Sequence, residues 1–121
     1  MMQIDEVRDF CLALPGTTED FPFDRETLAF RIGGKIYALM NIEVRPLRIN
    51  LKCTPDRAEE LRAEHPEIIP GYHMNKRHWN TVGLEAGLDD ELCRELIRHS
   101  YELVLAGLPK KLQDEISRET S

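Results

Sequence analysis

The pair Gly33-Gly34 lies between two apolar segments and constrains the fold more than any other feature of this 121-residue chain. Residues 27–32, TLAFRI, alternate with the period of a half-buried strand. Residues 35–42, KIYALMNI, are almost continuously apolar, as expected for a central strand. Two adjacent glycines can adopt the positive φ values of a two-residue hairpin loop. The sequence therefore predicts an antiparallel hairpin over residues 27–42.

Further segments extend this hairpin into a sheet. Residues 47–52, LRINLK, alternate cleanly, which places the apolar side chains on one face and the polar side chains on the other. Residues 72–74 and 78–84 are rich in aromatic and β-branched residues and are flanked by glycines, so they suit two short strands joined at residues 75–77. We expect a sheet of about five strands.

Three helices are predicted around these strands. Residues 4–14 carry a one-sided apolar stripe that ends before Pro15-Gly16. Thr54-Pro55-Asp56 is typical of a helix start, and that helix should run to about residue 64. A third helix follows the acids at 89–91 and ends near residue 107. The order α-β-β-β-α-β-β-α favours an α+β fold, a two-layer sandwich with an antiparallel sheet and helices on one face.

Length and cysteine usage bound the domain organisation and the compartment. A chain of this size fits one compact domain, which we assign to residues 1–108, followed by a polar C-terminal tail at 109–121. Cys11, Cys53 and Cys93 are an odd number without close pairing, which argues against a secreted disulfide framework. No apolar run approaches the ~18 residues of a membrane span. We therefore expect a cytoplasmic protein without a membrane partner.

No complete catalytic motif is present. His73 and His78 could approach each other across a short hairpin, with His65 or Cys53 as a further metal ligand, but the spacing is not that of a known zinc site. The other two cysteines lie on apolar helix faces, where buried thiols act as packing groups. The prediction is a non-enzymatic protein with no catalytic residues, no metal and no cofactor.

The distribution of charge along the chain favours binding of a polyanion, although the total charge is negative. The net charge is -6, yet residues 28–54 contain five Lys and Arg and one Glu. If the apolar strand residues face the helices, these cations point outward from an open sheet face, where they can contact phosphates. Trp79 offers a stacking surface, and Asn80 or Asn50 a base-edge or sugar contact. The predicted nucleic-acid-binding residues are Arg31, Lys35, Arg48, Lys52, Lys76, Arg77, Trp79 and Asn80.

Two other functions remain open at this point. A protein- or peptide-binding adaptor, including one that forms a homodimer, would use the same open sheet or its edge through exposed apolar or aromatic side chains. A small-molecule or enzymatic domain would require Tyr72, His73, His78 and Trp79 to line a pocket. Trp79 could equally serve as a packing residue of the hairpin, because its ring buries a large area.

The chain resembles the MmcQ/YjbR family of small bacterial proteins over residues 7–108. The resemblance implies a two-layer sandwich similar to secretion-chaperone-like folds and to the double-wing arrangement, and family members are usually labelled predicted DNA-binding proteins. It brings no catalytic residues and no cofactor. Its most specific part is NKRHWN, residues 75–80. The segments that carry it are CLALPGTTEDFPF, TLAFRIGGKIYAL, INLKCTPDRAEELR, PGYHMNKRHWNTV and SYELVLAGLPKK, in this order.

Overall fold

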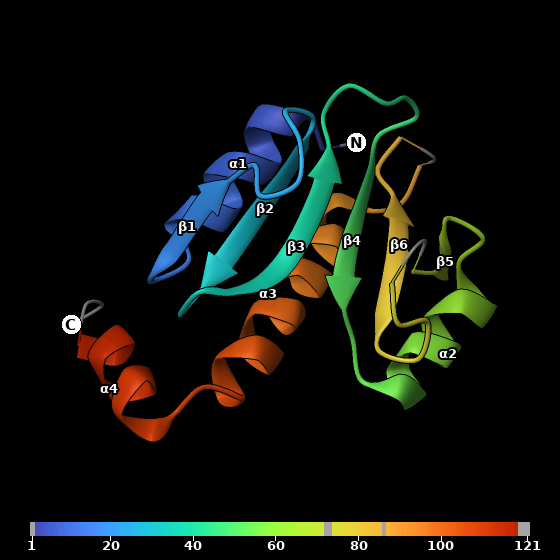
Figure 1. Cartoon of the computed structure of the whole chain (residues 1–121). Coiled ribbons are helices and arrows are strands. Elements are labelled where there is room, and N and C mark those ends of the chain that lie inside the picture. Colours follow the sequence, from blue (N-terminus) through green and yellow to red (C-terminus); the bar gives the residue numbers. More distant parts are fainter. Residues whose placement is uncertain (1, 72–73, 86, 119–121) are drawn as a thin grey trace.

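A computed structural model describes residues 2–71, 74–85 and 87–118 (Figure 1). Helices and strands follow one another largely in the order that the sequence predicts. The elements are α1 (Ile4–Ala13), β1 (Thr17–Asp20), β2 (Thr27–Ile32), β3 (Lys35–Asn41), β4 (Arg48–Lys52), α2 (Pro55–Glu64), β5 (Ile68–Pro70), β6 (Trp79–Gly83), α3 (Asp90–Ala106) and α4 (Lys110–Arg118).

The strands of the described residues form one antiparallel sheet in the order β1-β2-β3-β4-β6-β5. Helices α1, α2 and α3 cover one face of this sheet, and the other face is open (Figure 1). The predicted α+β two-layer sandwich is therefore confirmed. All three strands around the first hairpin lie within one residue of their expected bounds.

The predicted hairpin turns at Gly33 and Gly34, whose φ values are +58° and +80°. Both values lie in the left-handed region that glycine enters without steric cost. Gly33 also has no room for a side chain, because a Cβ atom there would come within 2.6 Å of the Leu108 side chain. The turn is thus packed against the segment that links α3 to α4.

Three features differ from the sequence-based expectation. The segment expected as an acidic loop contains β1, which pairs with β2 along Thr17–Asp20. The hairpin partner of β6 is β5 on the side away from β4, and the expected strand at 72–74 falls partly on Tyr72 and His73, outside the described residues. The expected polar tail contains α4, whose Ile116 is buried. β1 is polar and β5 has three residues, so neither shows a hydrophobic period, whereas α4 is mostly polar with one apolar side. Pairing and packing with distant segments stabilise all three elements.

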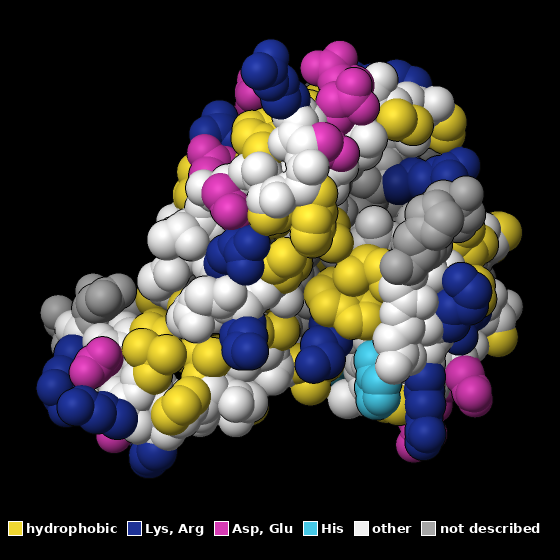
Figure 2. All heavy atoms as spheres, in the orientation of Figure 1, with side chains coloured by type: hydrophobic (Ala, Val, Ile, Leu, Met, Phe, Trp, Pro, Cys, Tyr) yellow, Lys and Arg dark blue, Asp and Glu magenta, His cyan; other side chains and the backbone are white. Residues whose placement is uncertain are grey.

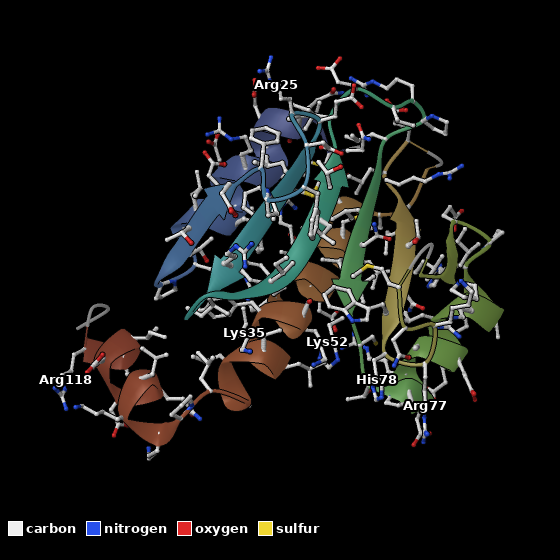
Figure 3. The ribbon with its side chains drawn as sticks, in the orientation of Figure 1. Arg25, Lys35, Lys52, Arg77, His78 and Arg118 are labelled. Carbon is white, nitrogen blue, oxygen red and sulfur yellow. The ribbon has the colours of Figure 1, made fainter. Side chains whose placement is uncertain are left out.

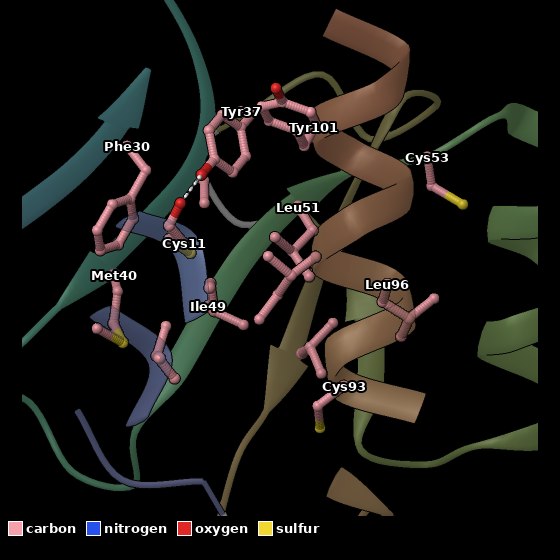
Figure 4. Packing of buried hydrophobic residues seen from close by; sticks show 14 of the residues in the cluster. Cys11, Phe30, Tyr37, Met40, Ile49, Leu51, Cys53, Cys93, Leu96 and Tyr101 are labelled. Carbon is pink, nitrogen blue, oxygen red and sulfur yellow. Dashed lines mark hydrogen bonds between the residues drawn. The ribbon is translucent and has the colours of Figure 1, made fainter. Parts of the chain in front are cut away.

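The core lies between the sheet and the helices and holds them in one position (Figure 4). Tyr37 of β3 is fully buried, and its ring meets Tyr101 of α3 edge-on, with 5.4 Å between the ring centroids. Ser100 of α3 donates a 2.5 Å hydrogen bond to the Tyr37 carbonyl and accepts one of 2.8 Å from the Lys52 backbone amide. Because α3 binds both central strands, their registry on the open face is also fixed.

Candidate functional site on the open sheet face

The centre of the open face is built from residues that the strand register brings together. Leu39 of β3 lies opposite Asn50 of β4, and Asn50 lies opposite Thr81 of β6. One step along, the pairing of Met40 with Ile49 brings Asn41 and Arg48 to adjacent positions. Opposed residues on one face of an antiparallel pair are about 5 Å apart, so these side chains are direct neighbours.

A groove of about 560 Å³ lies over these residues, beneath three loops. In the space-filling view, hydrophobic side chains gather in the middle of the open face, and cations lie around them singly (Figure 2). The walls come from the loops β1–β2, β3–β4 and β5–β6, which are far apart in the sequence. The lining residues are Phe23, Asp24, Thr27, Leu39, Asn41, Val44, Pro46, Arg48, Asn50, Met74 and Thr81.

The floor of the groove presents hydrogen-bond donors beside an apolar surface. The Asn50 Oδ1 atom accepts a 2.5 Å hydrogen bond from the Thr81 hydroxyl, and the Asn41 Oδ1 atom accepts one of 2.9 Å from the Glu43 amide. Within residues 2–71, 74–85 and 87–118, neither amide nitrogen donates a hydrogen bond, and Arg48 has no ion pair. The floor therefore offers cationic and neutral donors to a ligand.

Asp24 is the acidic residue of the groove lining, and its carboxylate is already engaged. It accepts hydrogen bonds from the backbone amides of Glu26 at 2.8 Å and Thr27 at 2.6 Å, and from the Thr27 hydroxyl at 3.2 Å. The Glu26 and Thr27 backbone bonds lower the pKa of Asp24 below its ordinary value, because they favour the charged form. Asp24 therefore shapes the loop that carries Phe23, a side chain that is 69% exposed.

Cations gather at the other end of the open face, where β3 begins, β4 ends and β6 begins. In Figure 3, Lys35, Lys52 and Arg77 follow one another along the lower edge of the sheet. The structure shows no hydrogen bond or ion pair from these three side chains to any residue that it describes. Lys76 lies in the same turn as Arg77, and its Nζ atom donates to the Gly71 carbonyl at 3.2 Å. We call Lys35, Lys52, Lys76 and Arg77 the basic edge.

Two predicted cations lie elsewhere on this face. The Arg31 Nε atom is 2.9 Å from the Asp20 carboxylate, and its Nη1 atom donates to the Gly34 carbonyl at 3.0 Å. The charge of Arg31 is thus balanced by a neighbouring strand. Arg48 lies in the groove, four residues before Lys52 on β4. At about 3.3 Å per strand residue, roughly 13 Å separates the two positions.

Asn80 does not lie on the open face at all. It pairs with Leu51 in the register, is 2% exposed, and accepts a 2.7 Å hydrogen bond from the Arg62 Nε atom of α2. The expectation that Asn80 and Trp79 act together on one surface requires this correction, because successive residues of a strand point to opposite faces. Trp79 is half-buried opposite Lys52, next to the basic edge.

The groove walls were not found by sequence reasoning. Phe23, Val44 and Met74 come from three loops, and nothing in their local pattern indicates that they converge. The outward positions of Arg48 and Asn50 on β4 were the signals available in the sequence. The small-molecule hypothesis centred on His78 and Trp79 finds neither residue in the groove lining, and Tyr72 and His73 lie outside the described residues.

The three cysteines of the chain are buried, and their thiols are shifted toward the protonated form. Burial raises the pKa of the Cys11 thiol to about 12 and that of Cys93 to about 11, and it also raises the pKa of Cys53. The described residues contain no cluster of three His, Cys, Asp or Glu side chains that could hold a metal ion. In the same part of the chain, each helix is too short or too polar to cross a bilayer.

Comparisons with known proteins agree on one family. A family model described as YjbR matches residues 12–103. Protein YbdF of Escherichia coli O157:H7 is 38% identical over 113 residues, which cover 93% of this chain and 92% of YbdF. Protein YjbR of Escherichia coli K12 is 32% identical over 111 residues, which cover 91% of this chain and 93% of YjbR.

Solved structures extend the similarity to the three-dimensional fold. The crystal structure of Deinococcus radiodurans protein DR2400, described with the domain DUF419, has a TM-score of 0.91 at 46% identity and covers 97% of this chain and 89% of that one. A crystal structure of a Pseudomonas syringae protein has a TM-score of 0.74 at 32% identity and covers 84% of this chain and 98% of that one. The α+β architecture is therefore shared with experimentally determined relatives.

Proposed function

The chain belongs to the YjbR family, and we propose that it binds duplex DNA through the basic edge of its open sheet face. The observation that carries this proposal is the placement of Lys35, Lys52 and Arg77 at one end of the sheet, without a partner among the described residues. Unpaired cations on a surface attract phosphates, and the release of counterions from the nucleic acid supplies most of the binding free energy.

The spacing of the basic edge suits a phosphate backbone. Lys35 begins β3, Lys52 ends β4, and Arg77 precedes β6, and these strands are adjacent in the sheet. Neighbouring strands are about 4.8 Å apart, so the three cations can follow successive phosphates of one DNA strand. Most acidic side chains seen from this side lie over the upper part of the molecule, and single ones lie among the cations at its lower end (Figure 2). The net charge of -6 therefore need not repel DNA at the basic edge.

The adaptor hypothesis gains no support from the sheet edges. The edge strands β1 and β5 contain 4 and 3 residues, and β5 ends in Pro70. Short edge strands, proline and charged side chains are features that discourage the addition of another strand. A peptide partner or a second copy of the chain would have to use the open face instead, which is the surface assigned here to DNA and to the groove.

The proposal is tested by titrating a fluorescent 20-base-pair duplex at salt concentrations from 50 to 200 mM. Three or four phosphate contacts predict a slope of about -2.7 to -3.6 for log K against log salt, and a roughly 40- to 150-fold loss of affinity over this range. Single-stranded DNA and RNA of the same length are titrated in parallel. A slope near zero contradicts the proposal, and tighter binding of either single strand contradicts its choice of duplex DNA.

A matched pair of double variants locates the surface. Lys35→Glu with Arg77→Glu reverses two cations of the basic edge and should weaken duplex binding by at least about tenfold, because two phosphate contacts are lost. Arg25→Glu with Lys111→Glu makes the same charge change at two exposed positions outside the basic edge. That control should stay within about threefold of the original protein. Equal losses in both variants would assign the effect to net charge alone.

A further inference from the structure

The groove at the other end of the open face combines an apolar surface with hydrogen-bond donors, a combination that the basic edge lacks. Its floor is formed by Leu39, Asn41, Arg48 and Asn50. We propose that this groove binds a small organic acid, with an apolar body between the loops and a carboxylate held by Arg48. This site is separate from the proposed DNA surface, because its floor lies toward the opposite end of β3 and β4. Either proposal can fail without the other.

The size and walls of the groove suit an apolar body. Its volume of about 560 Å³ falls within the range of roughly 300 to 1,000 Å³ typical of sites for small molecules. Leu39 is 9% exposed, yet it packs outside the main core, on the floor of the groove. Phe23 and Val44 are 69% and 49% exposed at the walls. An apolar ligand would remove these surfaces from water together, which favours binding.

The polar groups of the floor suit a carboxylate. The Arg48 guanidinium can donate two parallel hydrogen bonds to one carboxylate, a geometry that an ammonium group does not offer. Asn41 is adjacent to Arg48 across the strands, and Asn50 lies two residues further along β4 on the same face. Their oxygens already accept hydrogen bonds from Glu43 and Thr81, so their amide nitrogens are the groups left to face a ligand.

The one lining carboxylate does not oppose this arrangement strongly. Both Asp24 oxygens accept hydrogen bonds from Glu26 or Thr27, which disperse its charge within the loop. Asp24 and Thr27 lie on the β2 side of the groove, whereas Arg48 and Asn50 lie on β4, with β3 between them. A ligand can therefore place its carboxylate over β4 and its apolar body toward Phe23.

Nuclear magnetic resonance of the ¹⁵N-labelled full chain tests the proposal directly. The probes are benzoate, hexanoate and 3-phenylpropionate, each paired with its neutral amide, and a tetrapeptide ending in Phe with a free or an amidated terminus. We expect at least one small acid to shift the backbone signals of Leu39, Asn50 and Met74, and to bind at least about tenfold more tightly than its amide. Equal binding of acids and amides overturns the proposal.

The other outcomes are equally decisive. If no small acid shifts the groove signals at concentrations up to about 10 mM, the proposal is overturned. Binding of the free peptide terminus without binding of any small acid overturns it too, because the carboxylate would then belong to a polypeptide chain. Shifts confined to signals at the basic edge would assign the acids to that surface and contradict the groove site.

Two substitutions and one control separate the role of Arg48 from the stability of the fold. Arg48→Gln keeps a polar side chain at an exposed position, where Arg48 makes no hydrogen bond or ion pair with the residues that the structure describes, and it should abolish the preference for acid over amide. Asn50→Asp keeps the acceptor for the Thr81 hydroxyl and adds a negative charge, which should weaken acid binding at least about tenfold. Arg25→Gln, outside the groove lining, and the double variant of Lys35 and Arg77 should leave acid binding unchanged.

Discussion

Met40 and Leu39 are neighbours on β3, and they show how differently the two faces of the sheet exclude water. Met40 points toward the helices, is fully buried and belongs to the main core. Leu39 points to the open face, is 9% exposed and is covered only by side chains of the groove. The covered face is closed by helices that pack over its whole length, and the open face by loops alone. The first arrangement stabilises the fold, and the second leaves a surface that a ligand can complete.

The largest expected effect tests this contrast with one substitution on each face. Met40→Ala should lower the free energy of unfolding by about 2–5 kcal/mol, because it leaves a cavity in a closed core. Leu39→Ala should cost about 1 kcal/mol, because the space that it opens joins the groove and admits water. Urea unfolding of both variants measures the difference. Similar losses would mean that the loops close the open face as firmly as the helices close the other.

A smaller loss of stability is expected from a substitution on α2 where this helix contacts the beginning of β6. Arg62 donates to the Asn80 side chain at 2.7 Å and to the carbonyls of Trp79, at 3.3 Å, and Lys76. Arg62→Met leaves the buried Asn80 oxygen without this donor and should cost about 1.5–3 kcal/mol in urea unfolding. Arg57 lies on the same helix as Arg62 and forms an ion pair with Glu95 of α3. Arg57→Met removes that ion pair and should cost less than about 1 kcal/mol. Equal costs would contradict a structural role for the buried amide.

The smallest expected effect is the pH dependence of the free energy of unfolding that the buried Cys11 thiol contributes. Burial raises the pKa of Cys11 to about 12, whereas an unfolded cysteine ionises near pH 8.5. Above that pH the unfolded chain loses a proton that the folded chain keeps, so the free energy of unfolding falls as pH rises. The slope for one such thiol approaches about 1.4 kcal/mol per pH unit. Urea unfolding at pH 7 and pH 9.5 should show a smaller decrease for Cys11→Ala than for the original protein.

Local sequence patterns were sufficient for most of the fold. The Gly33-Gly34 pair, the alternation over residues 48–52 and the stripe of α1 each predict an element from residues that are close in the chain. The outward placement of Lys52 and Arg48 also follows from the two-residue period of a strand. β1 was missed because its four polar residues carry no strand pattern, and α4 was missed because its polar composition resembles a tail although its few apolar residues lie on one side.

The candidate sites depended far more on distant contacts. The sequence shows that Arg31, Lys35 and Arg77 are basic, but only the structure pairs Arg31 with Asp20 and leaves the other two without partners among the described residues. Likewise, Asn80 follows Trp79 in the chain, but the register of β6 turns it beneath α2.

The sequence by itself determined the α+β class, the central hairpin and which residues of β4 face outward, because hydrophobic period and turn chemistry are local properties. The tertiary structure alone decided which cations are balanced and that Phe23, Val44 and Met74 enclose a groove over Leu39. Those outcomes depend on three loops and four strands meeting in space. A surface formed in this way has no signature within any single segment, because its parts become neighbours only when the sheet is assembled.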